Sequence, residues 1–197
     1  MSSRGEATRL EILEHSADIA SVEGLEGLTI GQLAGHLEMS KSGLIRHFGS
    51  KESLQLATIE FARDLFLREV IAPVPENPPG LARLERLLES WLSYIERGVF
   101  SGGCFFWAAS AEFDGRPGHV RDQIALLTAS WLRQLEEEAA TAVKRGELRS
   151  DADVAQLAFE VHALVQEANW ASQLLVDKNA FEKARKGIRR RLREAAS

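Results

Sequence analysis

The sequence predicts an all-α protein built from about nine helices. Apolar residues recur at helical spacing through most of the chain, while alternating apolar and polar runs are short and β-branched clusters are scarce. Prolines and glycines interrupt this pattern and mark the turns. These observations predict helices joined by short connections, with no sheet.

Four helices are predicted before residue 72, and each begins at a Ser or Thr that can cap its free N–H groups. The capping residues and helix ends are, in order, Thr8 and Gly24, Thr29 and Leu37, Ser40 and Phe48, and Ser50 and Ile71. The apolar stripe of the first helix is formed by Leu10, Leu13, Ala17 and Ala20. The second and third helices are short and lie close together in the sequence, whereas the fourth is long.

Five further helices are predicted after a proline-rich connection at residues 73–79, because proline cannot continue a helix. Asp151 and Asp177 are the predicted caps of the last two helices. Each of the last two also carries an apolar stripe with no obvious layer to cover it, which predicts pairing with a second chain. The five predicted ranges are 81–95, 104–113, 117–145, 152–175 and 177–195.

Composition narrows the class of protein without naming its function. The chain has 197 residues, of which 45% are hydrophobic and 27% charged, as in ordinary globular proteins. No apolar run approaches the roughly 18 residues of a membrane span, and the N-terminus lacks a signal-peptide pattern. The single Cys104 cannot form an internal disulfide and is interpreted as a small buried side chain rather than a redox sensor. A cytoplasmic location is expected.

Residues 28–51 carry the informative chemistry. Two short predicted helices flank three or four residues, which is the length of a helix-turn-helix whose second helix enters the major groove of DNA. The net charge of −5 does not favour DNA, so any basic patch has to be local. The second helix offers Lys41, Ser42, Arg46 and His47, and its cap leaves free N–H groups for a phosphate. By pattern alone, a plain helical hairpin explains the segment as well.

The same segment resembles the N-terminal domain of the tetracycline-repressor family. Three of its strings follow the family order: residues 29–34 (TIGQLA), 39–44 (MSKSGL) and 47–54 (HFGSKESL). This resemblance implies a DNA-binding regulator. The residues that it assigns to DNA are Thr29, Ser40, Lys41, Ser42, Gly43, Arg46, His47 and Lys51.

Two positions depart from the family pattern. Glu38 stands where the family commonly has Gly, which costs on the order of 1 kcal/mol if the backbone there has positive φ. Ile45 stands where the family usually has Tyr or Phe, so a phosphate contact by a tyrosine hydroxyl is not available. The details of DNA docking are therefore expected to differ.

The resemblance implies a head and a body. Residues 1–50 are expected to form the helix-turn-helix domain, and residues 51–197 a ligand-binding and dimerisation domain, connected by the fourth helix at 51–72. The expected function is a repressor that binds near-palindromic operator DNA as a homodimer and is released by a small apolar or aromatic effector. The string at 102–106 (GGCFF) also looks like one branch of this family.

The ligand site is predicted where aromatic side chains gather in the body, with a few polar anchors. Ordinary core packing is the competing interpretation for each of them. The predicted ligand residues are Phe66, Trp91, Tyr94, Phe105, Phe106, Glu112, Phe113, His119 and Trp131. Glu112, Asp114 and His119 lack the spacing of a metal site, so neither a metal nor another cofactor is expected.

Two other classes of function were weighed against a repressor. An enzyme built on a helical bundle is disfavoured, because the chain shows no nucleophile–base pair, metal signature or phosphate loop. A helical interaction module that has lost DNA binding has only Glu38 and Ile45 in its favour. The basic C-terminal helix, residues 183–193, is either a second nucleic-acid patch or the solvated face of a dimer helix, and its opposite apolar stripe favours the dimer helix.

Overall fold

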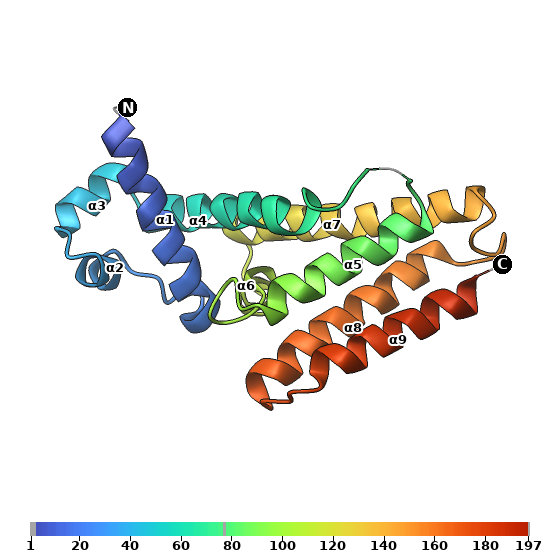
Figure 1. Cartoon of the computed structure of the whole chain (residues 1–197). Coiled ribbons are helices and arrows are strands. Elements are labelled where there is room, and N and C mark those ends of the chain that lie inside the picture. The colour runs from blue at the N-terminus through green and yellow to red at the C-terminus, as the bar shows by residue number, and fades with distance from the viewer. Residues whose placement is uncertain (1–2, 77, 197) are drawn as a thin grey trace. The chain divides into compact units, whose positions relative to one another are not determined.

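The computed structural model describes residues 3–76 and 78–196, and nine α-helices lie within them (Figure 1). The predicted all-α class is thereby confirmed. A π-helical segment, η1 (Leu67–Ile71), directly follows α4. The helices are α1 (Ser3–Glu23), α2 (Ile30–His36), α3 (Lys41–Phe48), α4 (Lys51–Phe66), α5 (Leu81–Glu96), α6 (Phe105–Phe113), α7 (His119–Lys144), α8 (Val154–Leu174) and α9 (Ala180–Ala195).

The described chain forms two compact units. The first contains residues 3–65 and 100–127, and the second contains residues 66–99 and 128–196. This grouping reflects packing, whereas the predicted boundary at residue 50 separates functions, so that boundary stays a prediction. Each unit is described by itself below.

In the first unit, α1 packs on α6 and α2, and α2 packs on α3. Two details of the predicted first helix are wrong. The helix begins at Ser3, so Thr8 lies inside it and does not cap it. Leu13, Ala17 and Ala20 are buried as predicted, but Leu10 is 57% exposed. Ile12 and Ser16, which were not in the predicted stripe, are buried beside them, so the buried face lies away from Leu10.

Local side-chain caps fix the starts of the next three helices, as the sequence predicts. Thr29 Oγ1 accepts a hydrogen bond from the backbone N–H of Gln32 at 3.1 Å. Ser40 Oγ accepts one from Gly43 at 3.1 Å, and Ser50 Oγ accepts one from Ser53 at 3.1 Å. Each bond satisfies one of the N–H groups that a helix start leaves free.

The turn between α2 and α3 contains a residue in the left-handed region. Glu38 has φ +50°, and the following N–H, of Met39, donates to Ala34 O at 2.9 Å. A side chain with a Cβ costs about 1 kcal/mol or more in this conformation. The backbone here therefore has the conformation in which glycine is favoured, and the tight turn tolerates Glu38 at that cost.

In the second unit, α8 and α9 run antiparallel, side by side, and α5 packs against both of them and against η1 (Figure 1). The core includes Trp91, Leu87 and Val161, all nearly inaccessible to solvent. The predicted caps of the last two helices are displaced by two residues. Asp153 rather than Asp151 caps α8, with Oδ1 accepting from Gln156 N–H at 3.0 Å.

The predicted cap of α9 at Asp177 is also displaced, since the helix begins at Ala180 with Asn179 before it. The carboxylate of Asp177 accepts from Asn179 N–H at 2.9 Å and pairs with Lys183 at 2.6 Å. The Lys183 hydrogen bond, followed by the Asn179 N–H, lowers the pKa of Asp177. Asp177 thus holds the turn before α9 rather than its first N–H groups.

Candidate DNA-binding surface and ligand site

The second helix of the helix-turn-helix, α3, presents its donors on an exposed face. Leu44 and Phe48 are buried beneath it, while Lys41, Ser42 and Arg46 are exposed. Leu44 and Phe48 anchor one side of the helix, so the opposite side is free for a partner. Ile45, also on this side, is 47% exposed and offers only apolar surface.

Close packing explains two glycines in this region. A Cβ on Gly43 would lie 3.1 Å from Ser40 Oγ, the atom that caps α3. A Cβ on Gly31 in α2 would lie 3.3 Å from the Lys41 side chain. Both contacts are tight. Gly43 leaves room for the Ser40 cap of its own helix, and Gly31 leaves room for the Lys41 side chain of α3 beside α2.

Arg9 of α1 fastens the C-terminal end of α3, and sequence analysis missed it. Its Nη1 donates to the backbone carbonyl of His47 at 2.8 Å, and its guanidinium lies 4.3 Å from the centre of the Phe48 ring. A cation is favourable at a helix C-terminus and over an aromatic face. No local signal in the sequence points to Arg9, because its partners lie 38 or more residues away.

Lys51, predicted to bind phosphate, is engaged within the protein. Its ammonium donates to the backbone carbonyl of Glu26 at 2.6 Å and to Glu26 Oε1 at 2.8 Å. Gln55 donates to the other oxygen of the same carboxylate at 3.1 Å. These two hydrogen bonds, that of Lys51 first, lower the pKa of Glu26. Any anion that binds Lys51 therefore competes with Glu26.

The loop between α1 and α2 is held by Glu112 at the end of α6. Its carboxylate accepts from the backbone N–H of Leu25 at 2.7 Å and from that of Glu26 at 3.1 Å. Gly24 has φ +86°, and a Cβ there would lie 2.8 Å from Glu112 Oε1. Gln55 Nε2 donates to Leu25 O at 2.9 Å from the side of α4. We call residues 24–27 with Glu112, Lys51 and Gln55 the loop clamp.

A second set of bonds joins the segment before α6 to α1. Ser101 N–H donates to Asp18 Oδ1 at 2.7 Å, and Gly102 N–H donates to Ser21 Oγ at 2.9 Å. A Cβ on Gly102 would lie 2.0 Å from the carbonyl oxygen of Ser21, so only glycine fits. This close approach explains the glycine at 102 in the GGCFF string.

Five of the predicted ligand residues lie in the first unit. Phe105 packs edge-on against Phe106 with ring centres 5.4 Å apart, and Phe113 has Arg116 at 5.6 Å over its ring. Exposed His119 lies 3.0 Å from Glu52, which is also exposed. The fifth is Glu112, whose carboxylate is occupied by the loop clamp. Ligand contacts by these residues stay predictions.

The other four predicted ligand residues form one aromatic cluster in the second unit. Phe66 is edge-on to Trp91, Tyr94 and Trp131, with ring centres 6.4, 5.7 and 5.1 Å away. His162 of α8, which sequence analysis did not select, lies 5.2 Å from Trp91 between ring centres. Burial lowers the pKa of His162 to about 4, so its imidazole is neutral at physiological pH.

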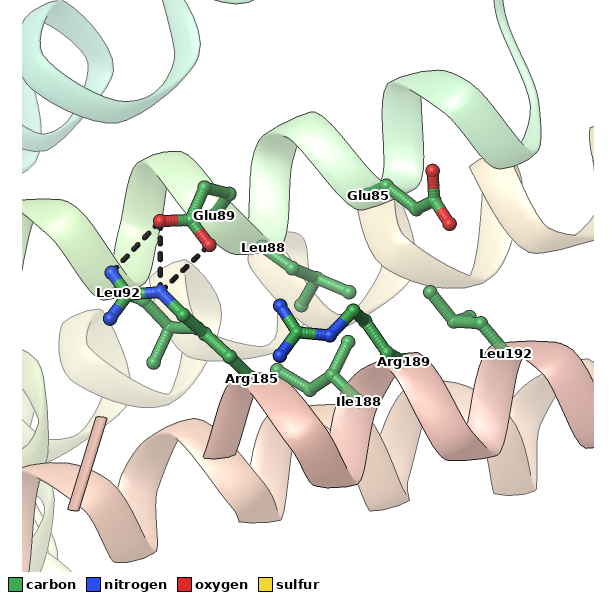
Figure 2. Close-up of a pocket in the computed structure, with 8 residues that line it drawn as sticks. All are labelled: Glu85, Leu88, Glu89, Leu92, Arg185, Ile188, Arg189 and Leu192. Carbon is green, nitrogen blue, oxygen red and sulfur yellow. Dashed lines mark hydrogen bonds and ion pairs between the residues drawn. The ribbon is translucent and has the colours of Figure 1, made fainter. Parts of the chain in front are cut away.

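The apolar stripe of α9 is covered within its own chain, which corrects the expectation that both terminal helices leave their stripes uncovered. Ile188 and Leu192 are buried, and Figure 2 shows them facing Leu88 and Leu92 of α5 in a groove of about 230 Å³. Arg185 closes one end of this groove by pairing with Glu89 at 2.8 Å.

The exposed apolar residues of α8 and of the turn after it are different, because they have no cover in the described chain. Phe159 and Leu174 are each 65% exposed, and Leu175 and Val176 in the turn that follows are 59% and 72% exposed.

Within the described residues, no helix is long and apolar enough to cross a membrane, and no three potential metal ligands lie together.

Comparisons with known proteins identify the family. The model for bacterial regulatory proteins of the tetR family matches residues 12–58. The model for the tetracyclin repressor-like C-terminal domain matches residues 80–188, more than half of the chain. The chain is also 28% identical over 142 residues to nucleoid occlusion factor SlmA of Idiomarina loihiensis, which covers 70% of each protein.

Solved structures share the fold. A TetR transcriptional regulator from Chloroflexus aurantiacus superposes with a TM-score of 0.90 at 23% identity, covering 99% of this chain and 98% of that one. The structure of AibR in complex with isovaleryl coenzyme A and operator DNA has a TM-score of 0.69 at 23% identity, covering 91% of this chain and 95% of that one. With both family models matching in order, the chain belongs to the tetracycline-repressor family and is a DNA-binding transcriptional regulator.

Proposed function

We propose that this regulator is a repressor that leaves its operator when a small, mainly aromatic ligand binds. The observation that carries the proposal is the loop clamp. Glu112 of α6 holds the backbone of the loop between α1 and α2, and that loop holds Lys51 at the start of α4. A shift of α6 therefore changes the geometry of the helix-turn-helix through hydrogen bonds that are already in place.

The proposed DNA contacts lie on the exposed face of α3 and at the neighbouring helix starts. Arg46 and Lys41 reach base edges or phosphates, and the capped start of α3 supplies free N–H groups for a phosphate. Lys51 exchanges Glu26 for a phosphate when DNA binds. The full proposed set is Thr29, Ser40, Lys41, Ser42, Gly43, Arg46, His47 and Lys51.

Release follows from linkage between two sites. A ligand that binds more tightly to the geometry that does not bind DNA lowers DNA affinity by the same factor. The complex of AibR with isovaleryl coenzyme A and operator DNA supports such a pairing of a small molecule and DNA in one protein of this fold. The ligand proposed for the present chain is smaller, aromatic and uncharged, since its candidate site is built from aromatic rings.

The repressor acts as a homodimer in this proposal, through the exposed side of α8. Phe159, Trp170 and Leu174 recur at helical spacing on that helix, and α9 covers its other side. A second copy of the same surface buries these side chains in an isologous contact. The dimer places two α3 helices in successive major grooves about one helical turn apart.

A mobility-shift titration with the DNA upstream of its own gene tests the proposal. The full chain should bind this DNA specifically, and Arg46→Ala should weaken binding by at least about tenfold. Lys51→Ala should reduce the slope of log affinity against log salt concentration by less than the amount expected for one phosphate contact. Arg190→Ala, which removes an exposed cation on α9, is the matched control and should leave binding unchanged. Unchanged binding by both head variants would refute this DNA surface.

Light scattering tests the dimer separately. The full chain should be a dimer at micromolar concentration. Leu174→Glu should make it a monomer, because a charge would be buried at the paired surface. Leu67→Glu, an exposed position outside α8, is the control and should leave the dimer intact. A monomeric full chain would contradict this part of the proposal.

A further inference from the structure

Four buried polar atoms without a hydrogen-bond partner in the described chain lie on three helices of the second unit. They are Trp91 Nε1 on α5, Thr128 Oγ1 and Trp131 Nε1 on α7, and Gln166 Oε1 on α8. Buried polar atoms in native proteins are nearly always hydrogen-bonded, so each such atom needs an explanation. We call these four residues the indole cluster.

The indole cluster is contiguous. The ring centres of Trp91 and Trp131 are 5.4 Å apart at an angle of 82°, and Trp91 is 5.2 Å from the ring of His162. Gln166 Nε2 lies 3.5 Å from His162 Nε2, one turn along α8. Thr128 precedes Trp131 by three residues and shares its face of α7. The unpartnered atoms therefore belong to one place rather than to separate packing faults.

Their chemistry is mainly that of donors. An indole N–H can only donate, so Trp91 and Trp131 both require an acceptor that the described residues do not provide. Thr128 can donate or accept, and Gln166 Oε1 can only accept. A partner with two acceptor atoms, and at most one hydroxyl, matches the set.

The surroundings favour an uncharged partner. Burial alone lowers the pKa of His162, and no charged group contributes to that shift. The aromatic neighbours include the rings of Phe66, Trp91 and Trp131, which are in edge-to-face contact. A carboxylate or ammonium in this environment would lose its hydration without gaining a counter-charge.

The cluster also borders accessible space. Phe66 and Trp131 each keep 9% of their surface exposed, and His162 and Gln166 are half-buried. A flat molecule can enter by displacing these partly exposed side chains, and it would then meet rings on either side.

We propose that the indole cluster binds the ring system of an uncharged aromatic carbonyl compound, whose oxygens accept hydrogen bonds from Trp91 and Trp131. The inference rests on the proposed function, since it names the chemical class of the effector. It adds Thr128, Gln166 and His162 to the aromatic residues selected from the sequence.

Matched pairs of probes test the class. Fluorenone and fluorene share a ring system and differ in one carbonyl, as do xanthone and xanthene. Calorimetric or tryptophan-quenching titration of the full chain should show each ketone binding at least about tenfold more tightly than its methylene analogue, because only the ketone carbonyl pairs with a buried N–H. A carboxylate derivative of fluorenone should bind more weakly than fluorenone.

Single variants locate the effect. Trp91→Phe and Trp131→Phe keep an aromatic ring and remove one N–H, so each should lower the ratio of ketone affinity to methylene-analogue affinity several-fold. The ratio cancels changes in ring packing that affect both probes alike. Trp107→Phe on α6, in the first unit, is the control and should leave the ratio unchanged, because its side chain is not part of the cluster. Circular dichroism confirms that the variants fold.

The outcomes separate this inference from the proposed function. Three results overturn the inference: equal affinity for a ketone and its methylene analogue, no binding of either ketone at its solubility limit, or an unchanged ratio in both cluster variants. Operator binding measured without any probe is independent of these results. Specific DNA binding with no preference for the ketones would support the proposed DNA-binding function and contradict the proposed effector class. Preferential ketone binding without DNA binding would support the effector class and contradict the DNA-binding function.

Discussion

The two compact units differ in how their polar side chains are bonded. In the first, the carboxylates of Asp18 and Glu112 and the amide of Gln55 each bond to backbone atoms of another element. In the second lie the four atoms of the indole cluster, which have no hydrogen-bond partner among the described residues. Satisfied bonds over long sequence distances specify one geometry. Unsatisfied ones leave interaction energy for a ligand to recover.

The largest expected effect tests the close packing of the first unit. Gly102→Ala should lower the free energy of unfolding by at least about 3 kcal/mol, because its Cβ would overlap the Ser21 carbonyl and force backbone shifts. Urea denaturation at fixed protein concentration measures this loss. Gly115→Ala, with no neighbouring atom within 4 Å, is the control and should change stability by less than about 0.5 kcal/mol. Equal losses would show that the close approach is not what matters.

A pH titration tests the second unit through His162. Its pKa of about 4 in the folded chain lies below the ordinary 6.5, so between these values the unfolded chain binds the additional proton. The stability from neutral His162 is complete above pH 6.5 and is lost as the pH falls toward 4, by about 2–3 kcal/mol.

His162→Phe should remove that part of the pH dependence, as measured by denaturant midpoints from pH 7 to about 4. The exposed His36→Gln in α2 serves as the comparison and should retain the wild-type slope. A variant at 162 with an unaltered slope would mean that this imidazole is solvated and that the second unit is not closed to charge.

The loop clamp gives the next effect. Glu112→Leu should cost about 2 kcal/mol, because the part-buried N–H of Leu25 would lose its acceptor. Glu112→Gln, which retains an acceptor oxygen, should lose about half as much. Thermal and urea unfolding measure both losses, and operator affinity should fall in the same order. If Glu112→Leu unfolds at the wild-type midpoint, the clamp contributes nothing to the first unit.

The smallest effect sharpens the comparison most directly, since one substitution is made in each unit. Thr58 in α4 donates its hydroxyl to Leu54 O at 2.8 Å, whereas Thr128 Oγ1 has no partner in the described chain. Thr58→Val should therefore cost about 1 kcal/mol, and Thr128→Val should be neutral or stabilising by up to about 1 kcal/mol. Differential scanning calorimetry of the two variants measures the difference. A cost at Thr128 equal to that at Thr58 would place a bound water on its hydroxyl.

The sequence predicted features set by nearby residues. Capping bonds at Thr29, Ser40 and Ser50 span three residues, so the pattern locates them correctly. The predicted cap is two residues away from the observed one where two acidic residues lie close together, as Asp151 and Asp153 do. Either carboxylate can cap a helix, and the packing of α8 determines which of them does. Helical spacing predicts a buried Leu10, because it continues the pattern of the buried positions that follow. Leu10 lies at the edge of that face, where a rotation of the helix by part of a turn exposes a side chain without changing the spacing.

The site depended on contacts that periodicity cannot reveal. Glu112 meets Leu25 across 87 residues, and Arg9 meets His47 across 38. Neither pair has a spacing rule, so Glu112 was interpreted as a ligand anchor and Arg9 was not selected. Four aromatic residues predicted for the ligand site form one cluster in the second unit, and their role there stays a prediction. Their polar neighbours His162 and Gln166 resemble ordinary surface residues of a helix in the sequence.

The pairing of Lys51 with Glu26 has a kinetic consequence. Because a carboxylate already lies 2.8 Å from the ammonium, a phosphate that takes Lys51 exchanges one anion for another instead of capturing a solvated cation. Glu26 is tethered and returns at a high effective concentration as soon as the phosphate moves away. If Lys51 binds a phosphate as proposed, the returning carboxylate would shorten the lifetime of that contact. Residence time on DNA would then depend on Glu26, a residue outside the proposed DNA-binding set.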